Sequence, residues 1–264
     1  MHLTRFRFNT HRPGARRLLS SPQALHAAVM GGFPDLLPGT SSPGDPLAGI
    51  AGSSEAGGSG GEGDRPRVLW RVDHNAKAEV LLYVVSPGRP ELTHMVEQAG
   101  WPHAEEGPGW RTLDYSGFLS RLEAGQTWAF RLTANPVHSI RRKDGEDTKP
   151  TAHVTPRHQA GWLLKKQERC GFEVRRTRKS DPALPEMDGY ELLVHDRNSA
   201  GFDKPDPRPE RKGKRMRVPV VTATFDGRLT VTDPDLLRQA LSAGIGRAKA
   251  YGCGLMTLAP VGER

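Results

Sequence analysis

A glycine-rich stretch near the C-terminus places the strongest constraint on how this chain can fold. Residues 244–255 read GIGRAKAYGCGL and come directly after a helical pattern. Glycine lets the backbone adopt positive φ and lets a ligand approach the peptide N–H groups, while Arg247 and Lys249 place positive charge beside those donors. The stretch therefore suits a phosphate backbone. Alternatively, it is a turn between a helix and a final strand that needs glycine for its dihedral angles alone.

Two common nucleotide-binding motifs do not fit this stretch. It contains no Gly-Lys-Ser/Thr sequence, which ends a P-loop. It also follows a helix rather than a strand, so a dinucleotide-binding fingerprint lacks its structural context.

The positive charge of the chain is unevenly distributed. The formal net charge is +8. Residues 1–134 carry 13 Lys and Arg against 13 Asp and Glu, whereas residues 135–264 carry 25 against 17. All of the excess therefore lies in the second half. Such an asymmetry is typical of a half that binds a polyanion, the alternative being a solvated basic surface.

The cysteines and the apolar segments indicate the compartment. Cys170 and Cys253 are far apart in the sequence and lack Cys-x-x-Cys spacing, so we expect neither a disulfide framework nor a zinc site. The longest apolar run, residues 80–85, is too short to span a bilayer, and residues 1–8 lack the apolar core of a signal peptide. We expect a soluble protein in the reducing cytoplasm, without a membrane partner.

The first half of the chain predicts one α+β unit with the order strand, helix, strand, strand, helix, strand. Between the first strand and the first helix we expect a basic linker, and Ser21 and Pro22 supply a helix N-cap and first turn. A glycine- and serine-rich segment, residues 35–66, has too little apolar content to fold and is predicted to be a disordered insertion. Strands are predicted at 1–8, 67–73, 80–85 and 127–133, and the linker at 11–17. One helix is predicted to end at 31–32, and a second to lie within 89–122.

A second unit of the same kind is predicted from residue 135 onward. Thr155 and Pro156 open a helix that Gly171 ends. The dipeptide Asp226-Gly227 predicts a two-residue hairpin turn. Strands are predicted at 172–178, 190–196, 218–225 and 228–232, and a last helix follows Asp233-Pro234. The fold class is therefore α+β, with two tandem ferredoxin-like (RRM-like) domains at residues 1–134 and 135–264.

A basic arm is predicted between the middle strands of the second unit. It has the composition of a charged hairpin loop, or of an arm that follows the phosphates of an RNA stem, since A-form RNA is recognised mainly through its shape and backbone. The arm begins after Lys204, and its cations are Arg208, Arg211, Lys212, Lys214, Arg215 and Arg217.

The glycine-rich stretch also carries a resemblance to a known family. Residues 244–260 resemble the C-terminal signature of CasE, the repeat-specific endoribonuclease of type I-E CRISPR systems. Further motifs agree in their order along the chain: the start Met-x-Leu-Thr-Arg, FRLTANP at 130–136, and TFDGRLTV at 224–231. Together they bracket most of the sequence.

The resemblance implies a partner, an activity and a binding surface. The implied partners are a CRISPR repeat stem-loop, the mature CRISPR RNA and other subunits of a Cascade-type surveillance complex. The implied activity is metal-independent cleavage of the precursor RNA, without a cofactor, by attack of a 2′-OH that leaves a 2′,3′-cyclic phosphate and a free 5′-OH. Besides the basic arm, the expected RNA-binding residues are Gly244, Gly246, Arg247, Lys249, Gly252 and Gly254.

His26 is the predicted catalytic residue. Histidine suits both acid and base roles near neutral pH, and residues 22–29 match the helix that carries the catalytic histidine in CasE. His26 would act as the general acid or the general base. A tyrosine often stands three residues earlier in the family, but this chain has Gln23, which cannot exchange a proton at this pH. Lys249, Arg247 or a cation of the arm could stabilise the charged phosphorane.

Other functions remain open from the sequence alone. A non-catalytic RNA-binding protein of the same double fold is favoured if Gln23 marks lost chemistry. A nucleotide-binding or metal-dependent enzyme could use the glycine-rich stretch. His153 and His158 are five residues apart and have no carboxylate or cysteine in their motif, so we expect no metal site there.

Overall fold

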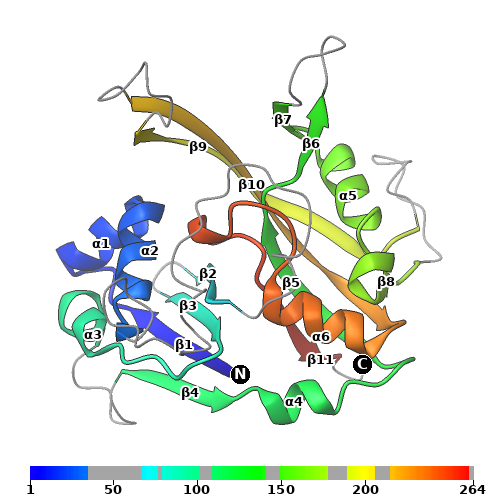
Figure 1. Ribbon diagram of the computed structural model, residues 1–264, viewed down its shortest axis with the longest axis horizontal. Helices are drawn as coiled ribbons and strands as arrows, with labels where there is room; N and C mark the ends of the chain where they lie inside the picture. The colour runs from blue at the N-terminus through cyan, green and yellow to red at the C-terminus, as the bar shows by residue number, and fades with distance from the viewer. Residues whose placement is uncertain are drawn as a thin grey trace, which may run out of the picture.

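The computed structural model describes residues 1–34, 67–76, 79–101, 109–140, 149–177, 189–205 and 215–261 (Figure 1). The insertion predicted at 35–66 lies outside these residues, as do Arg208, Arg211, Lys212 and Lys214 of the basic arm. Within the described part of the chain, no helix is both long and apolar enough to cross a membrane.

The first sheet has four antiparallel strands in the order β2-β3-β1-β4. Three helices accompany it, and Figure 1 shows them together at the left of the molecule. The strands are β1 (His2–Phe8), β2 (Leu69–Ala76), β3 (Glu79–Ser86) and β4 (Trp110–Asp114), and the helices are α1 (Pro13–Ser20), α2 (Pro22–Met30) and α3 (Thr93–Ala99). Phe6 and Phe8 of β1 are fully buried in the core formed with these helices. The predicted alternation of β1 is therefore confirmed.

The second sheet has the order β11-β5-β10-β8, and the long strand β9 pairs with β10. Its strands are β5 (Thr127–Ala134), β8 (Phe172–Val174), β9 (Leu192–Pro205), β10 (Arg215–Val231) and β11 (Met256–Pro260), with helices α5 (Pro156–Leu164) and α6 (Pro234–Ala243). The remaining elements are α4 (Ser116–Ser120), the hairpin of β6 (Val137–Ile140) and β7 (Lys149–Ala152), and the 3-10 turns η2 (Glu168–Cys170) and η4 (Lys249–Tyr251).

Both sheets confirm the predicted fold class. In each, the first and third strands of a β-α-β-β-α-β unit lie at the centre and the second and fourth at the edges, which is the ferredoxin-like arrangement. The predicted helix caps are also present. The side chains of Ser21, Thr155 and Asp233 accept hydrogen bonds from backbone N–H groups of the helices they precede. The helix that Thr155 caps ends earlier than predicted, at Leu164. Gly171 adopts the left-handed conformation, with φ 70°, at the end of the separate turn η2.

The assignment of the strand at 127–133 to the first unit was wrong. This strand, β5, pairs with β10 and β11 in the second sheet, so the second unit begins before residue 134. The fourth strand of the first sheet is β4, in the region where only a helix was predicted. β4 is a short edge strand with no buried side chain, so it lacks the clear apolar alternation of a half-buried strand.

The hairpin turn predicted at Asp226-Gly227 was also wrong. β10 continues through both residues, which pair with β5 and β9 as ordinary strand positions. Gly227 is needed for a different reason: a Cβ there would lie 2.4 Å from the carbonyl oxygen of Glu191 and 2.9 Å from the ring of Phe130. The glycine thus permits close approach of neighbouring strands rather than a turn.

The basic linker predicted at 11–17 overlaps a helix, α1. Ala15 and Leu18 are buried three residues apart on its inner face, and Pro13 occupies the first turn. The cations around them, Arg12, Arg16 and Arg17, concealed this short apolar stripe. α1 then leads through Ser21 directly into α2.

Candidate functional site

The helix α2 presents His26 at the margin of the first core. Leu25 and Val29 are buried on its inner face, His26 is half-buried, and Gln23 is exposed. The sequence predicts an apolar stripe at Leu25, Ala28 and Val29 with His26 one residue off it, at the edge of the buried face, and this position is confirmed. The side chain is accessible while its backbone is held by a capped helix.

The environment of His26 favours its neutral form. Burial lowers the pKa of the imidazole from its ordinary value of 6.5 because the charged form loses solvation. The Nδ1 atom is buried and has no hydrogen-bond partner among the described residues. A charged ring would bury an unpaired N–H at this atom, which adds to the preference for the neutral form.

The glycine-rich stretch folds into a tight loop that carries η4. Gly244, Gly246, Gly252 and Gly254 all have positive φ, between 77° and 91°. The N–H of Gly254 donates to the carbonyl of Thr133 in β5, at 2.7 Å, and its own carbonyl accepts from Ile245, at 2.9 Å. These bonds fix the loop to the second sheet.

Aromatic and apolar side chains cover the glycines of this loop. An added Cβ would meet Trp162 at Gly246, Leu69 at Gly244, and Trp70 at Gly252, each within 3 Å. Leu69 and Trp70 belong to β2, so the loop packs against the first unit. Gly252 and Gly254 are themselves buried. Their positive φ and close packing explain these two glycines without a ligand.

The loop also brings its cations toward the helix of His26. η4 lies in contact with both α2 and β2 (Figure 1). Arg247 is exposed, and the ammonium of Lys249 donates to the carbonyl oxygen of Gly246 at 2.7 Å. Tyr251 of the same loop is half-buried, and burial raises the pKa of its phenol. His26 and Lys249 thus lie on elements that meet at one seam between the two units, whereas Arg247 forms a backbone bridge with Asn135, just after β5.

The basic arm is built on the paired strands β9 and β10. In Figure 1 the two strands extend together from the second sheet toward the side of α1 and α2. In their register, Arg215 is opposite Pro205 and Arg217 is opposite Asp203. Arg215 and Arg217 therefore lie at the outer end of this ribbon, next to the segment that holds the other four predicted cations.

A cluster of histidine rings lies elsewhere, beside α5. The rings of His138 and His153 are stacked with centroids 4.3 Å apart, and those of His153 and His158 are 5.9 Å apart. Burial, together with positive charge on His138, His158 and Lys165, lowers the pKa of His153. Among the described residues, no group of three or more His, Cys, Asp or Glu side chains is arranged to hold a metal ion.

Sequence reasoning missed the buried charges that join the two units. Arg71 of β2 is only 1% exposed and forms two hydrogen bonds with the carboxylate of Asp73, at 2.6 and 2.9 Å. The alternation of β2 indicated Trp70 and Val72 as its inner face, and gave no signal that the opposite face was buried too. A polar pair two residues apart in a strand was the available hint, because such residues share one face.

The comparisons with known proteins agree along the whole chain. A family model described as CRISPR associated protein matches residues 1–260. The chain therefore belongs to this family of CRISPR-associated proteins. Two curated relatives are Cse3, a CRISPR-associated endoribonuclease of Thermus thermophilus, and CasE, a Cascade subunit of Escherichia coli. The first is 26% identical and covers 98% of this chain and all of the relative, and the second is 28% identical and covers 73% and 89%.

Solved structures share the fold. A structure of Thermus thermophilus Cse3 bound to an RNA representing a pre-cleavage complex matches with a TM-score of 0.63 and 23% identity, over 98% of each chain. The Cas6e protein of Escherichia coli matches with a TM-score of 0.52 and 19% identity, over 99% of this chain and 100% of the other. These findings confirm the resemblance to CasE that the sequence motifs indicated.

Proposed function

We propose that this protein is an endoribonuclease that binds the stem-loop of a CRISPR repeat and cleaves the precursor RNA. The curated relative that matches along its full length is named an endoribonuclease, and the solved relatives include RNA complexes and a CRISPR RNA-guided surveillance complex. After cleavage the protein would stay with the mature guide RNA in a Cascade-type complex in the cytoplasm. The excess positive charge of the second half supports a polyanionic substrate.

The observation that carries this proposal is the position of His26 beside the cationic loop. The imidazole is half-buried on a capped helix, and η4, which begins at Lys249, contacts the same helix. Arg247 stands two residues earlier in this loop, in a backbone bridge with Asn135. RNA cleavage by an internal nucleophile needs a proton donor or acceptor together with positive charge for the phosphorane. This seam supplies both kinds of group.

In the proposed reaction the 2′-OH of the RNA attacks the neighbouring phosphorus. The bond to the 5′-oxygen breaks, and the products are a 2′,3′-cyclic phosphate and a free 5′-OH. His26 either removes the proton from the 2′-OH or donates one to the leaving 5′-oxygen. Gln23, one turn earlier and exposed, can orient the RNA by hydrogen bonding but supplies no proton.

We assign the two units different tasks. The first carries His26, and the second carries the basic arm and the cationic loop. The strand pairing suggests a boundary between α4 and β5, in place of residue 134. Of the predicted RNA-binding residues in the loop, Arg247 and Lys249 are the proposed contacts, and Gly244 and Gly246 are partly exposed beside them. Gly252 and Gly254 act by shaping the loop.

Cleavage of a repeat RNA tests this function. The unaltered protein should cut the RNA in the presence of EDTA and should bind, but not cut, the same RNA with 2′-deoxyribose at the scissile nucleotide. His26→Ala should lower the cleavage rate by about 10²–10⁴-fold, the usual contribution of a general acid or base. Its RNA affinity should be retained. Efficient cutting of the deoxy substrate would overturn the mechanism.

The second candidate is a non-catalytic RNA-binding protein of the same fold. Gln23 favours it, because the chain lacks a proton-exchanging group at that position. The two functions separate in the same assay. A binder would hold the repeat RNA with unchanged affinity in both His26→Ala and the unaltered protein, and neither would produce a cyclic phosphate.

A further inference from the structure

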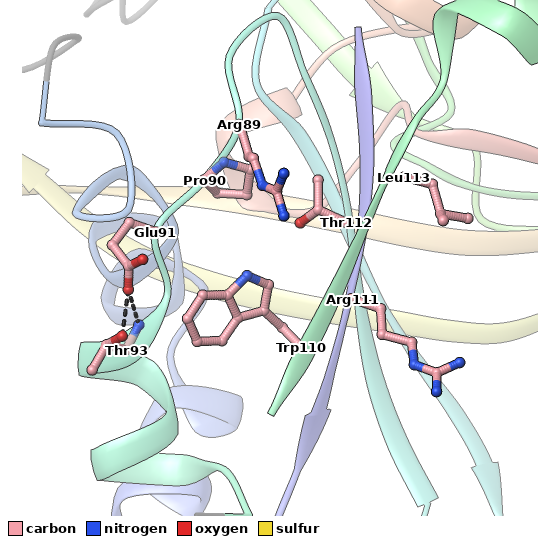
Figure 2. Close-up of a pocket in the computed structure, with 8 residues that line it drawn as sticks. All are labelled: Arg89, Pro90, Glu91, Thr93, Trp110, Arg111, Thr112 and Leu113. Carbon is pink, nitrogen blue, oxygen red and sulfur yellow. Dashed lines mark hydrogen bonds between the residues drawn. The ribbon is translucent and has the colours of Figure 1, made fainter. Parts of the chain in front are cut away.

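An open pocket lies on the first unit, at its edge strand. It has a volume of about 740 Å³ and is formed by β4 and the segment that leads into α3 (Figure 2). In Figure 2, Trp110 and Thr112 point from β4 toward this segment, whereas Arg111 and Leu113 point to the other side of the strand, as the alternation of a strand requires. Arg89 and Glu91 border the pocket from the facing segment.

The side chains around this pocket offer three different kinds of contact. The indole of Trp110 presents an aromatic surface at the centre. Arg89 is exposed, and no hydrogen bond or ion pair joins it to the described residues. Glu91 accepts hydrogen bonds through Oε1 from the N–H and the hydroxyl of Thr93, which lower the pKa of its carboxyl. Its Oε2 remains as an acceptor toward the pocket.

The pocket is attached to the helix that carries His26. The N–H of Glu91 donates to the carbonyl of Gly32, just past the end of α2, at 2.9 Å. His94 in α3 bonds the carbonyl of Ala28 within α2, at 2.8 Å. His26 lies about one helical turn before the end of α2. α2 therefore links the two places across the first sheet: η4 contacts α2 beside the edge strand β2, and the pocket lies at the opposite edge strand, β4.

We propose that this pocket binds one unpaired nucleotide of the RNA and prefers a base that carries an exocyclic amino group. The base stacks on Trp110, since every base offers a π face to an aromatic side chain. Arg89 binds the phosphate, and Oε2 of Glu91 accepts a hydrogen bond from the amino group. Adenine, cytosine and guanine have such a donor and uracil does not. This subsite rests on the proposed RNA function.

The test measures binding of AMP, CMP, GMP and UMP to the full chain by saturation-transfer NMR. The three amino-bearing nucleotides should bind more tightly than UMP. Arg89→Gln should weaken them by about tenfold or more, because it removes a charge-assisted hydrogen bond. Arg121→Gln, which removes an equally exposed cation at the end of α4, should leave binding unchanged.

A specificity reversal provides a sharper criterion. In Glu91→Gln, the side-chain oxygen would still accept from Thr93, and the amide NH₂ would face the pocket as a donor. This variant should prefer UMP, whose O4 is an acceptor. Absence of binding by all four nucleotides, unchanged binding in Arg89→Gln, or an unchanged order of preference in Glu91→Gln would each overturn the subsite.

Failure of the pocket proposal can be distinguished from failure of the proposed nuclease function. If the unaltered protein cuts repeat RNA but binds no mononucleotide, the pocket proposal fails and the nuclease remains. If it binds the mononucleotides with the expected preference but does not cut repeat RNA, the nuclease proposal fails and the pocket remains.

Discussion

The guanidinium of Arg71 donates from Nη1 to the carbonyl oxygen of Leu255, at 3.1 Å. Leu255 stands where the glycine-rich loop enters β11, so this bond ties β2 of the first unit to the end of the loop. Arg71 also donates to the carbonyl of Arg131 in β5, at 2.7 Å, and to the hydroxyl of Thr257 in β11, at 2.8 Å. One buried cation therefore joins three strands of the two sheets.

Replacing Arg71 should destabilise the protein strongly. Arg71→Met leaves the carboxylate of Asp73 buried, with Arg131, at 3.7 Å, as its remaining ion-pair partner among the described residues. Breaking a buried pair in this way typically costs about 3–5 kcal/mol, which for a chain of this size lowers the melting temperature by roughly 6–20 °C. Thermal unfolding measures the change, with exposed Arg121→Met as the control. The double variant Arg71→Met, Asp73→Leu should recover much of the loss, and equal stability of the single variant and the unaltered protein would contradict the role of this pair.

The glycine at position 252 should not tolerate a side chain. A Cβ there would lie 2.7 Å from the ring of Trp70, at a φ of +77°. Overpacking and the left-handed backbone together predict a loss of about 2–4 kcal/mol for Gly252→Ala. The control is Gly117→Ala in α4, where nothing lies within 4 Å of the new Cβ. Urea unfolding of the two variants should differ clearly, and equal midpoints would mean that the loop can move away from Trp70.

The free energy of unfolding should rise with pH on the acid side of neutrality. The pKa of His26 and that of His153 are lowered in the folded state, so between these values and 6.5 the unfolded chain binds more protons than the folded one. Stability therefore increases as pH rises through this window, and this contribution is complete above 6.5. Urea unfolding between pH 5 and 8 measures it. His26→Gln should flatten the rise, whereas exposed His11→Gln should not; an unaltered slope in His26→Gln would argue against a buried neutral ring.

The pH dependence of cleavage should reveal the role of His26. Its lowered pKa means that the ring is mostly neutral at pH 7. If His26 is the general base, the rate should rise with pH, with its inflection below 6.5, and then level off. If it is the general acid, the rate should fall with increasing pH above its pKa, approaching tenfold per pH unit. Single-turnover rates between pH 5 and 8 distinguish the two roles, and a profile with no inflection below 6.5 would contradict both.

Binding of the repeat RNA should depend on the basic arm through salt. Replacing Arg208, Arg211 and Arg215 by Gln should weaken binding and reduce the slope of log K against log[salt] by roughly one unit for each lost phosphate contact. Titrations at several salt concentrations measure the slope, with Arg121→Gln as the matched control. An unchanged slope in the triple variant would place the binding surface elsewhere.

Local signals in the sequence were sufficient for most elements of the fold. Caps such as Ser21 and Asp233 and the alternation of Phe6 and Phe8 act through neighbouring residues, so a single sequence reveals them. The order of strands followed from their number and from the helices between them. The errors concerned partners far away in the sequence. The sequence of β5 is compatible with the last strand of the first unit and with the first strand of the second unit. Its pairing with β10 shows that it belongs to the second.

Prediction of the candidate site had the same limit: local features could be predicted, and contacts between distant segments could not. The sequence placed His26 correctly at the margin of a buried helix face, because helical periodicity is local. It could not show that Trp70 covers Gly252, since those residues are distant in the chain and nothing in either segment encodes their contact. It likewise gave no sign of the pocket at β4, whose Arg89 and Trp110 come from separate segments with ordinary composition.

The contact between α2 and η4 determines when the proposed site can form during synthesis of the chain. Ribosomes deliver His26 more than two hundred residues before Arg247 and Lys249, so a growing chain holds only the first half of the proposed site while the segment between them is made. The second half arrives only when the last strand, β11, can also pair with β5. A nascent chain that has not yet reached the glycine-rich loop therefore lacks one half of the proposed site.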